Sequence, residues 1–345
     1  MEMDKIDIKS LTEEQLRNEM ISIGEKAFRG TQIFQWIYKG AKSFSEMKNI
    51  TAELRGKLED KFVLRDLKID KKLVSAIDGT RKYLFRLHDG TAIESVMMIY
   101  KHGVSVCIST QAGCRMGCNF CASTIGGLER NLTAGEMLDQ IMKIQEDAGK
   151  RVSNVVLMGS GEPFDNFEEV IRFLHVANEK NGLCIGYRHI TLSTCGIVPK
   201  IYEIADMGMP INLAISLHAA NDEKRKTIMP IANAYSIDEI IKACRYFVER
   251  TNRRITFEYS LIKGFNDSPG DAKELAGLLK GMLAHVNLIP VNSIEERDYK
   301  KPSKDEIEAF TRILAKSGIS ATVRREMGSD INGACGQLRK SSISG

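Results

Sequence analysis

The first part of the chain has its apolar residues at helical spacing. In TQIFQWIYKG the residues Ile33, Phe34 and Ile37 recur as they do on one face of a helix, and Gly40 supplies a stop. The segment LTEEQLRNEMISIG has a similar glycine stop at its end. We therefore predict a small helical module at residues 1–60.

The pattern then changes to one that is typical of β-strands. The apolar stretches KKLVSAI, RKYLFRLH and TAIESVMMIY are separated by Asp78-Gly79 and Asp89-Gly90, two dipeptides that favour tight hairpin turns. Residues 61–102 are therefore predicted to form a β-rich connecting segment.

From residue 103 to 345 apolar runs alternate with amphipathic helical stretches. The apolar runs are GVSVCIST, SNVVLMG, HITLST, INLAISL, RITFEYSLI, HVNLIPV and SATVRR. Such alternation predicts parallel strands joined by right-handed helical crossovers. About six strand–helix units are fewer than the eight of a closed barrel, so we predict an α/β fold with a partial, open (β/α)6 barrel.

Polar residues follow several of these predicted strands. They are GSGEP at 159–163, STCG at 193–196, SLHAAND at 216–222, KGFND at 263–267 and VNS at 291–293. In barrels of this type the carboxyl ends of the strands form the active face. We therefore expect these segments to meet in one cavity.

Composition adds limits on location and partners. The chain has 345 residues, of which 43% are hydrophobic and 27% charged, as in ordinary globular proteins. The start, MEMDKIDIKSL, has no signal-peptide pattern, and no apolar stretch reaches the length of a membrane span, so we expect a cytoplasmic protein without membrane contact. A net charge of +4 does not decide whether nucleic acid is the partner.

The eight cysteines indicate cluster or redox chemistry, because the cytoplasm does not favour a disulfide framework. Cys114, Cys118 and Cys121 lie within eight residues, after the strand GVSVCIST and before a helix for which Thr133 and Glu136 form a capping box. Iron–sulfur clusters are held by thiolates and normally take four, so three leave one iron open to a ligand.

A zinc knuckle is the structural alternative for this loop. It would use the same three cysteines together with Cys107 or His102. Structural zinc sites usually pair two short Cys or His steps at a distance, and C-x-x-x-C-x-x-C does not have that form. We therefore favour the cluster.

The C-x-x-x-C-x-x-C motif after a first barrel strand resembles the signature of the radical S-adenosylmethionine (SAM) superfamily. A narrower resemblance covers essentially the whole chain, to the bacterial adenine-C2 RNA methyltransferases of the RlmN family. It is carried by SxQxGC at 109–114, FCAST at 120–124, ERNLT at 129–133, GEP at 161–163, SLHAxND at 216–222 and ACGQL at 334–338.

This resemblance implies a radical SAM methyltransferase acting on C2 of adenosine, in the peptidyl-transferase loop of 23S rRNA and beside the anticodon of tRNA. It implies a [4Fe-4S] cluster on the three motif cysteines and two SAM molecules per turnover. It also implies a monomer with flavodoxin or ferredoxin as electron donor. Residues 1–60 become an RNA-binding candidate, and 103–345 a radical SAM partial barrel that ends in a catalytic cysteine loop.

Three side chains receive catalytic roles from the resemblance. Cys335 matches the cysteine that is methylated, Cys107 matches the resolving thiol, and Glu94 matches a glutamate that accepts a proton. From the residues alone, a small core residue is the alternative for Cys107, and a solvent-facing strand carboxylate is the alternative for Glu94.

The resemblance also assigns SAM-binding positions. They are Gly161, Glu162, Ser193, Ser216, Leu217, His218 and Asn292. For His218 a structural role is the alternative, since a histidine after an apolar strand often only satisfies its neighbours. Cys184, Cys195 and Cys244 are interpreted as structural, with Cys244 in helix packing.

Two segments depart from the family pattern. Asn332-Gly333 stand before Ala334 where the family usually has Asp-Ala, and Ser160 stands where methionine is common. Two other functions remain open: the sister family that methylates C8 of the same adenosine, and a non-catalytic RNA-binding regulator that carries a metal or cluster.

Overall fold

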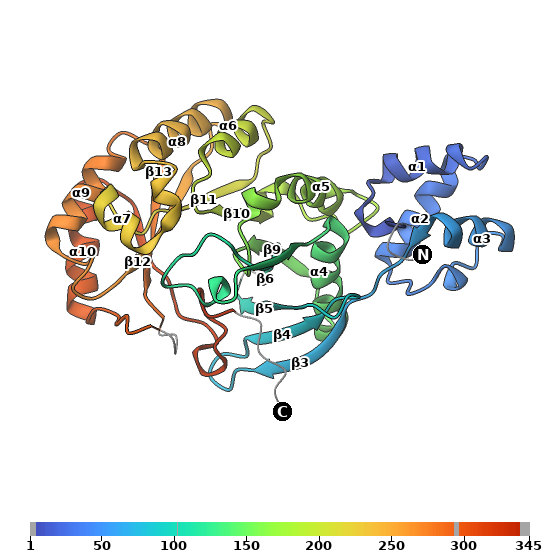
Figure 1. The fold of residues 1–345 in the computed structure, drawn as a ribbon, viewed down its shortest axis with the longest axis horizontal. Helices are drawn as coiled ribbons and strands as arrows, with labels where there is room; N and C mark the ends of the chain where they lie inside the picture. The colour runs from blue at the N-terminus through green and yellow to red at the C-terminus, as the bar shows by residue number, and fades with distance from the viewer. Residues whose placement is uncertain (1–4, 102, 293–296, 339–345) are drawn as a thin grey trace.

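The computed structural model describes residues 5–101, 103–292 and 297–338, and its centre is one ten-stranded sheet. In spatial order the strands are β14 (Ala321–Val323), β13 (Ala284–Pro290), β12 (Ile255–Leu261), β11 (Asn212–Ser216), β10 (Ile190–Thr194), β9 (Val152–Leu157), β6 (Gly103–Ile108), β5 (Ala92–Tyr100), β4 (Arg81–Arg86) and β3 (Lys68–Val74). Figure 1 shows the strands curving as an open barrel.

The strands from β6 to β14 are parallel, and helical crossovers join them along the chain. The helices are α4 (Ala134–Ala148), α5 (Phe167–Asn178), α6 (Val198–Asp206), α7 (Asp222–Ile228), α8 (Ile237–Thr251), α9 (Pro269–Leu279) and α10 (Lys304–Lys316). In Figure 1 they cover the outside of the curved sheet. The predicted partial (β/α)6 barrel is confirmed, and β14 extends it by one strand.

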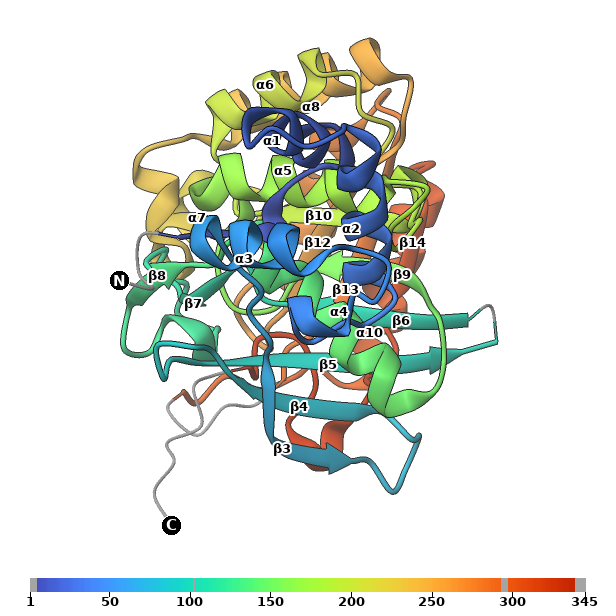
Figure 2. The ribbon, with the colours of Figure 1, turned by 90° about the vertical axis from the view of Figure 1, so that its right-hand side faces the viewer.

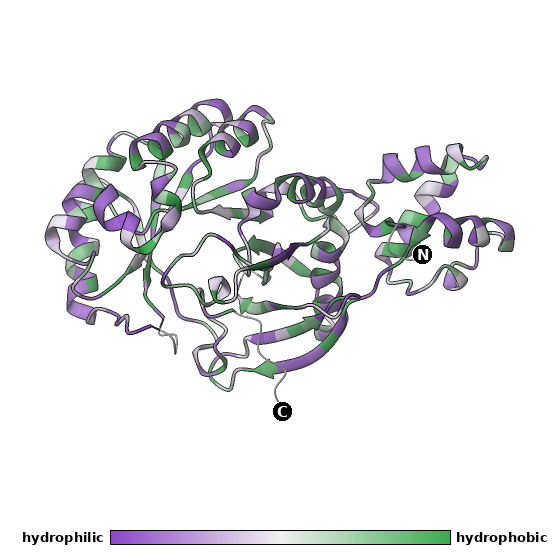
Figure 3. Cartoon of the chain, in the orientation of Figure 1, coloured by the Kyte–Doolittle hydropathy of each residue, from purple (hydrophilic) through white to green (hydrophobic). Residues whose placement is uncertain are grey.

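Local sequence explains where these helices begin. Thr133 and Glu136 form the capping box predicted for α4, with each side chain bonded to the other residue's backbone. Apolar side chains follow the inner faces, so green and purple alternate along the helices in Figure 3.

The β-rich segment extends the same sheet. Strands β3, β4 and β5 are antiparallel, and β5 pairs antiparallel with β6. The turns between them contain Asp78-Gly79 and Asp89-Gly90, as predicted from the dipeptides. Both glycines have positive φ, which a side chain would disfavour.

The first residues form a separate helical unit beside the barrel. It contains β1 (Ile6–Asp7), α1 (Glu13–Ser22), α2 (Phe28–Tyr38), α3 (Ala52–Lys61) and β2 (Phe62–Val63), with β1 parallel to β2. Figures 1 and 2 show it against the α4 and α5 side of the barrel. Buried contacts fix it there: Lys9 Nζ lies 2.6 Å from Asp139 of α4, and Ser10 Oγ accepts a hydrogen bond from Gly135 N.

Short elements complete the described chain. They are the hairpin β7 (Gln111–Gly113) and β8 (Leu128–Asn131), and the 3-10 turns η1 (Ile8–Ser10), η2 (Phe44–Glu46), η3 (Ala122–Thr124), η4 (Pro163–Asn166), η5 (Tyr187–His189), η6 (Pro230–Asn233) and η7 (Ser329–Ile331). Within these residues no helix has the length and apolar character needed to cross a bilayer.

Candidate active site

The carboxyl ends of the parallel strands surround a cavity of about 150 Å³, here called the thiol cavity. The side chains of Cys114, Cys118 and Cys121 line one part of it. The predicted strand-end residues that also line it are Gly161, Glu162, Ser193, Ser216, His218 and Asn292. Four of the five predicted polar segments meet in this cavity. The fifth, KGFND at 263–267, does not line it, because Asn266 is buried and donates to the carbonyls of His218 and Ser260 instead.

The cysteine loop is held by backbone hydrogen bonds. Cys114 N donates to Gly127 O at 3.1 Å, and Asn119 N donates to Ile228 O at 2.9 Å. Within the described ranges, no three His, Cys, Asp or Glu side chains converge as the ligands of a single ion would. Three thiols around one cavity wall instead suit a cubane, whose ligands bind at separate corners.

The zinc alternative has little support in this arrangement. Cys107 does not line the thiol cavity, so it does not join the three motif cysteines. His102, the other fourth ligand considered, lies outside the described residues. The donor set that the structure brings together is three thiols beside an open space, which fits a cluster with one free iron.

Leu217 differs from its prediction. It is the one member of the predicted SAM set that does not line the thiol cavity, because its side chain is fully buried in the hydrophobic core. Alternation along the chain places Ser216 and His218 on the cavity side and turns the side chain between them inward. The carbonyl of Leu217 accepts a hydrogen bond from Arg225 Nε at 3.1 Å.

The GEP segment is rigid. Gly161 has φ +108°, and a Cβ atom there would lie 2.7 Å from the backbone nitrogen of Gln111, so only glycine fits. Glu162 accepts from Phe164 N at 2.9 Å through Oε1 and from Cys195 N at 2.7 Å through Oε2. Burial raises the pKa of this carboxyl, and the two N–H donors oppose that rise.

His218 has a satisfied ring. Its Nδ1 atom accepts a hydrogen bond from Ser260 N at 2.9 Å, and its ring packs edge-on against Phe120 with centroids 4.7 Å apart. Burial lowers the pKa of His218 to about 3, with Arg225 adding to the effect. The imidazole is therefore neutral near pH 7, and the structural alternative describes its ring well.

A second cavity of about 460 Å³, here called the outer cavity, adjoins the first. Cys107, Tyr100 and Arg325 line the outer cavity alone. The two cavities share Met158, Ile289, Asn292, Arg324 and Cys335. Cys335 therefore stands at the junction between the three-cysteine site and a larger chamber.

The loop that carries Cys335 is tied to the cysteine loop and to a predicted SAM-binding residue. Asn292 Nδ2 donates to Cys335 O at 2.9 Å, and Ala122 N donates to Gly336 O at 2.8 Å. Ser123 Oγ donates to Leu338 O at 2.6 Å. These bonds reach Cys335 and the residues that follow it from two separate segments, Asn292 and the cysteine loop, and they hold Cys335 between the cavities.

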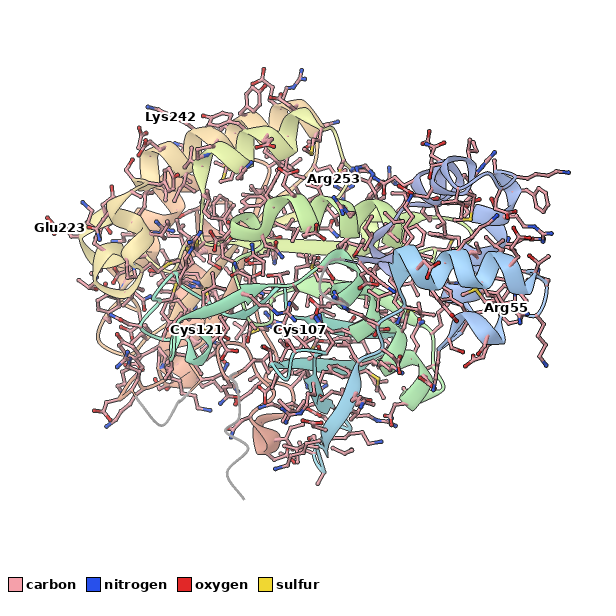
Figure 4. All side chains as sticks on the ribbon, turned by 45° about the vertical axis from the view of Figure 1, so that its right-hand side comes forward. Arg55, Cys107, Cys121, Glu223, Lys242 and Arg253 are labelled. Atoms are coloured by element: carbon pink, nitrogen blue, oxygen red, sulfur yellow. The ribbon has the colours of Figure 1, made fainter. Side chains whose placement is uncertain are left out.

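Cys107 lies on β6 and packs with Val96, Met98, Met327 and Leu338. Cys107 is only 6% exposed, as the core-residue alternative predicts. It also lines the outer cavity, so its thiol faces an internal space. Burial raises the pKa of its thiol to about 12. Figure 4 labels Cys107 and Cys121, which lie within the barrel and far from the N-terminal helices.

Glu94 is buried on β5, with 2% of its surface exposed, so the solvent-facing alternative is wrong. It has the same strand face as Val96, whose partner across the ladder is Cys107. Lys82 Nζ lies 3.0 Å from Glu94 Oε1. Glu94 does not line either cavity, and its link to the Cys335 loop runs through Lys82, whose Nζ also donates to the Asn332 carbonyl.

Three charged residues were missed by sequence reasoning. Arg324 lines both cavities, and Cys335 and Glu258 raise the pKa of its guanidinium further above the usual range. Glu258 is the one carboxylate in the apolar run RITFEYSLI, a signal that could have been used. Lys82 gave no such signal, because its partners are distant in sequence.

Comparison with known proteins agrees with this geometry. A model of the radical SAM superfamily matches residues 108–276, and one described as ribosomal RNA large subunit methyltransferase N-terminal domain matches residues 6–64. The chain is 64% identical over 340 residues to a protein of Clostridioides difficile named as the dual-specificity RNA methyltransferase RlmN, covering 99% of both chains. The chain belongs to the RlmN family.

Other relatives support the same placement. A protein of Alkaliphilus oremlandii with the same RlmN name is 60% identical, with 98% of each chain covered. A crystal structure described as a radical SAM methyltransferase from Sphaerobacter thermophilus has a TM-score of 0.92 and 43% identity, and covers 97% of this chain and 99% of its own. Membership in the RlmN family brings a [4Fe-4S] cluster and SAM as cofactors.

Proposed function

We propose that this protein methylates C2 of adenosine in 23S rRNA and in tRNA. The observation that carries the proposal is the position of Cys335, which joins the thiol cavity to the outer cavity where Cys107 lies. A methyl group received on the first side can be passed to a base on the second. A non-catalytic RNA-binding regulator would have no use for this junction.

The chain has residues suited to both cofactors. Cys114, Cys118 and Cys121 would hold the cluster, and the strand-end residues that line the thiol cavity would bind SAM. When bound, these cofactors supply the methyl group and the one-electron chemistry. Such a route is needed because C2 of adenine is an electron-poor carbon that does not attack a SAM methyl group.

The chain's own side chains carry the remaining steps. Cys335 accepts the methyl group and later holds the base through its sulfur. Glu94 accepts the proton lost from C2; it is a buried carboxylate that is linked to the Cys335 loop through Lys82. Cys107, as a thiolate, then attacks the sulfur of Cys335, so that a disulfide forms and the bond from sulfur to the methylene carbon breaks. That carbon leaves with the electron pair and takes a proton, which makes it the methyl group on C2.

The outer cavity is suited to a nucleotide. Its lining combines the aromatic ring of Tyr100 with the basic side chains of Lys301, Lys304 and Arg325. Aromatic rings stack on bases, and lysine or arginine neutralises phosphates. We place the target adenosine here, and the N-terminal helices at residues 1–60 as a further RNA contact.

Two local features support an ordered Cys335 loop despite its departure from the family pattern. The family usually has an acidic residue at position 332, and here Asn332 takes a left-handed conformation with φ +51° that asparagine tolerates. Ala334 N donates to Gln337 Oε1 at 3.1 Å, which closes the loop locally. The departure from the family pattern therefore leaves an ordered loop.

The proposal extends to partners and location. An enzyme that consumes electrons needs a low-potential donor such as flavodoxin or ferredoxin, and an RNA substrate places the protein in the cytoplasm. We propose that it acts as a monomer, since both cavities are lined by one chain.

The test is the nucleoside content of RNA from cells with and without the gene. Mass spectrometry of digested 23S rRNA and tRNA should show 2-methyladenosine that disappears from both on deletion. Loss of 8-methyladenosine instead would assign the chain's activity to C8, and no lost methyladenosine would overturn the proposal.

A further inference from the structure

Lys82 is a buried lysine in line with two proposed catalytic residues. It lies on β4 opposite Val96 of β5, and Val96 lies opposite Cys107 of β6. Cross-strand partners share one face of a sheet, and so do residues two apart along a strand. Lys82, Glu94 and Cys107 therefore occupy the same face of three adjacent strands.

The ammonium of Lys82 pairs with Glu94 in a region with little access to water. Their side chains are 10% and 2% exposed, and the distance from Nζ to Oε1 is 3.0 Å. Burying a lysine is costly unless it is paired and its donors are satisfied. This ion pair therefore fixes the direction of the Glu94 carboxylate more firmly than a surface pair would.

A second bond from the same ammonium reaches the Cys335 loop. Lys82 Nζ donates to the carbonyl of Asn332 at 3.2 Å, three residues before Cys335. The preceding turn is fixed by the sheet as well, because Gly328 N donates to Asp78 Oδ2 at 3.0 Å and Gly333 N donates to Gly328 O at 2.9 Å. The loop thus meets the antiparallel strands at defined points.

We propose that Lys82 is a positioning residue that holds the Glu94 carboxylate and the Cys335 loop in one fixed arrangement. This inference rests on the proposed function, in which Glu94 takes the C2 proton of a base that is bound to Cys335. One ammonium then sets the distance between the proton acceptor and the sulfur that carries the base. Lys82 itself touches neither substrate nor cofactor.

The first test is a kinetic double-mutant cycle on the reconstituted full-length enzyme. Lys82→Met should lower kcat for RNA methylation by about tenfold or more, with KM for RNA changed less than about twofold, because proton transfer depends on the placement of Glu94. Adding Lys82→Met to Glu94→Gln should slow the enzyme by clearly less than Lys82→Met slows the wild type, since the part of the loss that acts through Glu94 is already gone. Lys82→Arg should recover most of the rate, because arginine keeps the charge and the donors.

The second test reads the loop without substrate. Amide hydrogen exchange in the peptide spanning 326–338 should be about tenfold faster in Lys82→Met than in the wild type, because one anchor of the loop is removed. Lys143→Met is the matched control: its side chain is 11% exposed and pairs with Asp66 at 2.6 Å, away from the loop. This control should leave exchange of that peptide unchanged.

Either of two results would overturn the inference. One is a kcat loss in the double variant that equals the product of the two single losses. The other is loop exchange in Lys82→Met that equals the wild type. A wild-type enzyme that makes no methylated adenosine would contradict the proposed function instead, and the exchange comparison would still decide whether Lys82 anchors the loop.

Discussion

Burial distinguishes cysteines that look alike in the sequence. Cys184 is exposed and Cys244 is fully buried in helix α8, whereas Cys335 is half-buried at the junction of two cavities. The pKa of Cys107, raised to about 12 by burial, keeps it a thiol at neutral pH until a partner takes its proton. A resolving thiol that stays protonated would not react before the base is attached.

The cluster assignment is tested by one substitution in the cysteine loop. Cys118→Ala removes one of three thiols, so anaerobically reconstituted protein should lose its brown colour and nearly all its iron and sulfide. Cys184→Ala, at an exposed site outside both cavities, is the control that should keep them. Wild-type protein that contains one zinc and no iron would contradict the assignment.

Secondary structure was predictable where local chemistry decides it. The capping box of α4, the turns at Asp78-Gly79 and Asp89-Gly90, and the alternation of strand and helix all follow from neighbouring residues. The sequence did not reveal that β3, β4 and β5 continue the barrel sheet, because strand pairing is a long-range property.

The residues of the candidate site also fall into two groups, those that the sequence predicts and those that only the structure reveals. The motif cysteines and strand-end residues could be named in advance, since spacing and resemblance identify them. Lys82, Arg324 and the inward turn of Leu217 could not, because each depends on contacts between distant segments. Burial of Glu94 was equally hidden, since strand alternation alone allows either face.

At the level of elements, the N-terminal helical unit meets the barrel through a buried charged cluster. Lys9 pairs with Asp139, and Leu67 N donates to Asp139 Oδ2 at 2.7 Å. Asp7 lies beside them, and its Oδ2 atom has no hydrogen-bond partner among the residues that the structure describes. Burial raises the pKa of Asp7 to about 7, against the attraction of Lys9 and Arg65.

This cluster predicts a pH-dependent effect of Asp7→Asn. The folded-state pKa of Asp7, about 7, lies above the ordinary aspartate pKa of 3.8, so the native state loses stability as pH rises from about 4 to 7. Removing the carboxyl should therefore raise the free energy of unfolding, relative to wild type, by about 2 to 4 kcal/mol more at pH 8 than at pH 4. Urea unfolding at both pH values measures this, and an equal difference at both would contradict the burial argument.

At the level of the whole molecule, the Cys335 loop connects the three-thiol cavity with the buried pair of Glu94 and Lys82. Parallel strands supply a cavity with three thiols, the antiparallel extension supplies Glu94 and Lys82, and the Cys335 loop lies between them. In the function proposed above, neither the barrel nor the extension alone would connect Cys335 to both the thiol cavity and Glu94. The two cavities explain why the chain needs cysteines beyond its cluster ligands.

The central claim is that Cys335 carries the base and Cys107 releases it. The most direct measurement is a denaturing gel of reconstituted variants incubated with SAM, a reductant and radiolabelled RNA. Cys107→Ala should trap a covalent protein–RNA adduct, because the bond to Cys335 forms and is not resolved, whereas the double variant Cys107→Ala with Cys335→Ala should trap none. An adduct that persists without Cys335, or no adduct in Cys107→Ala, would contradict the account.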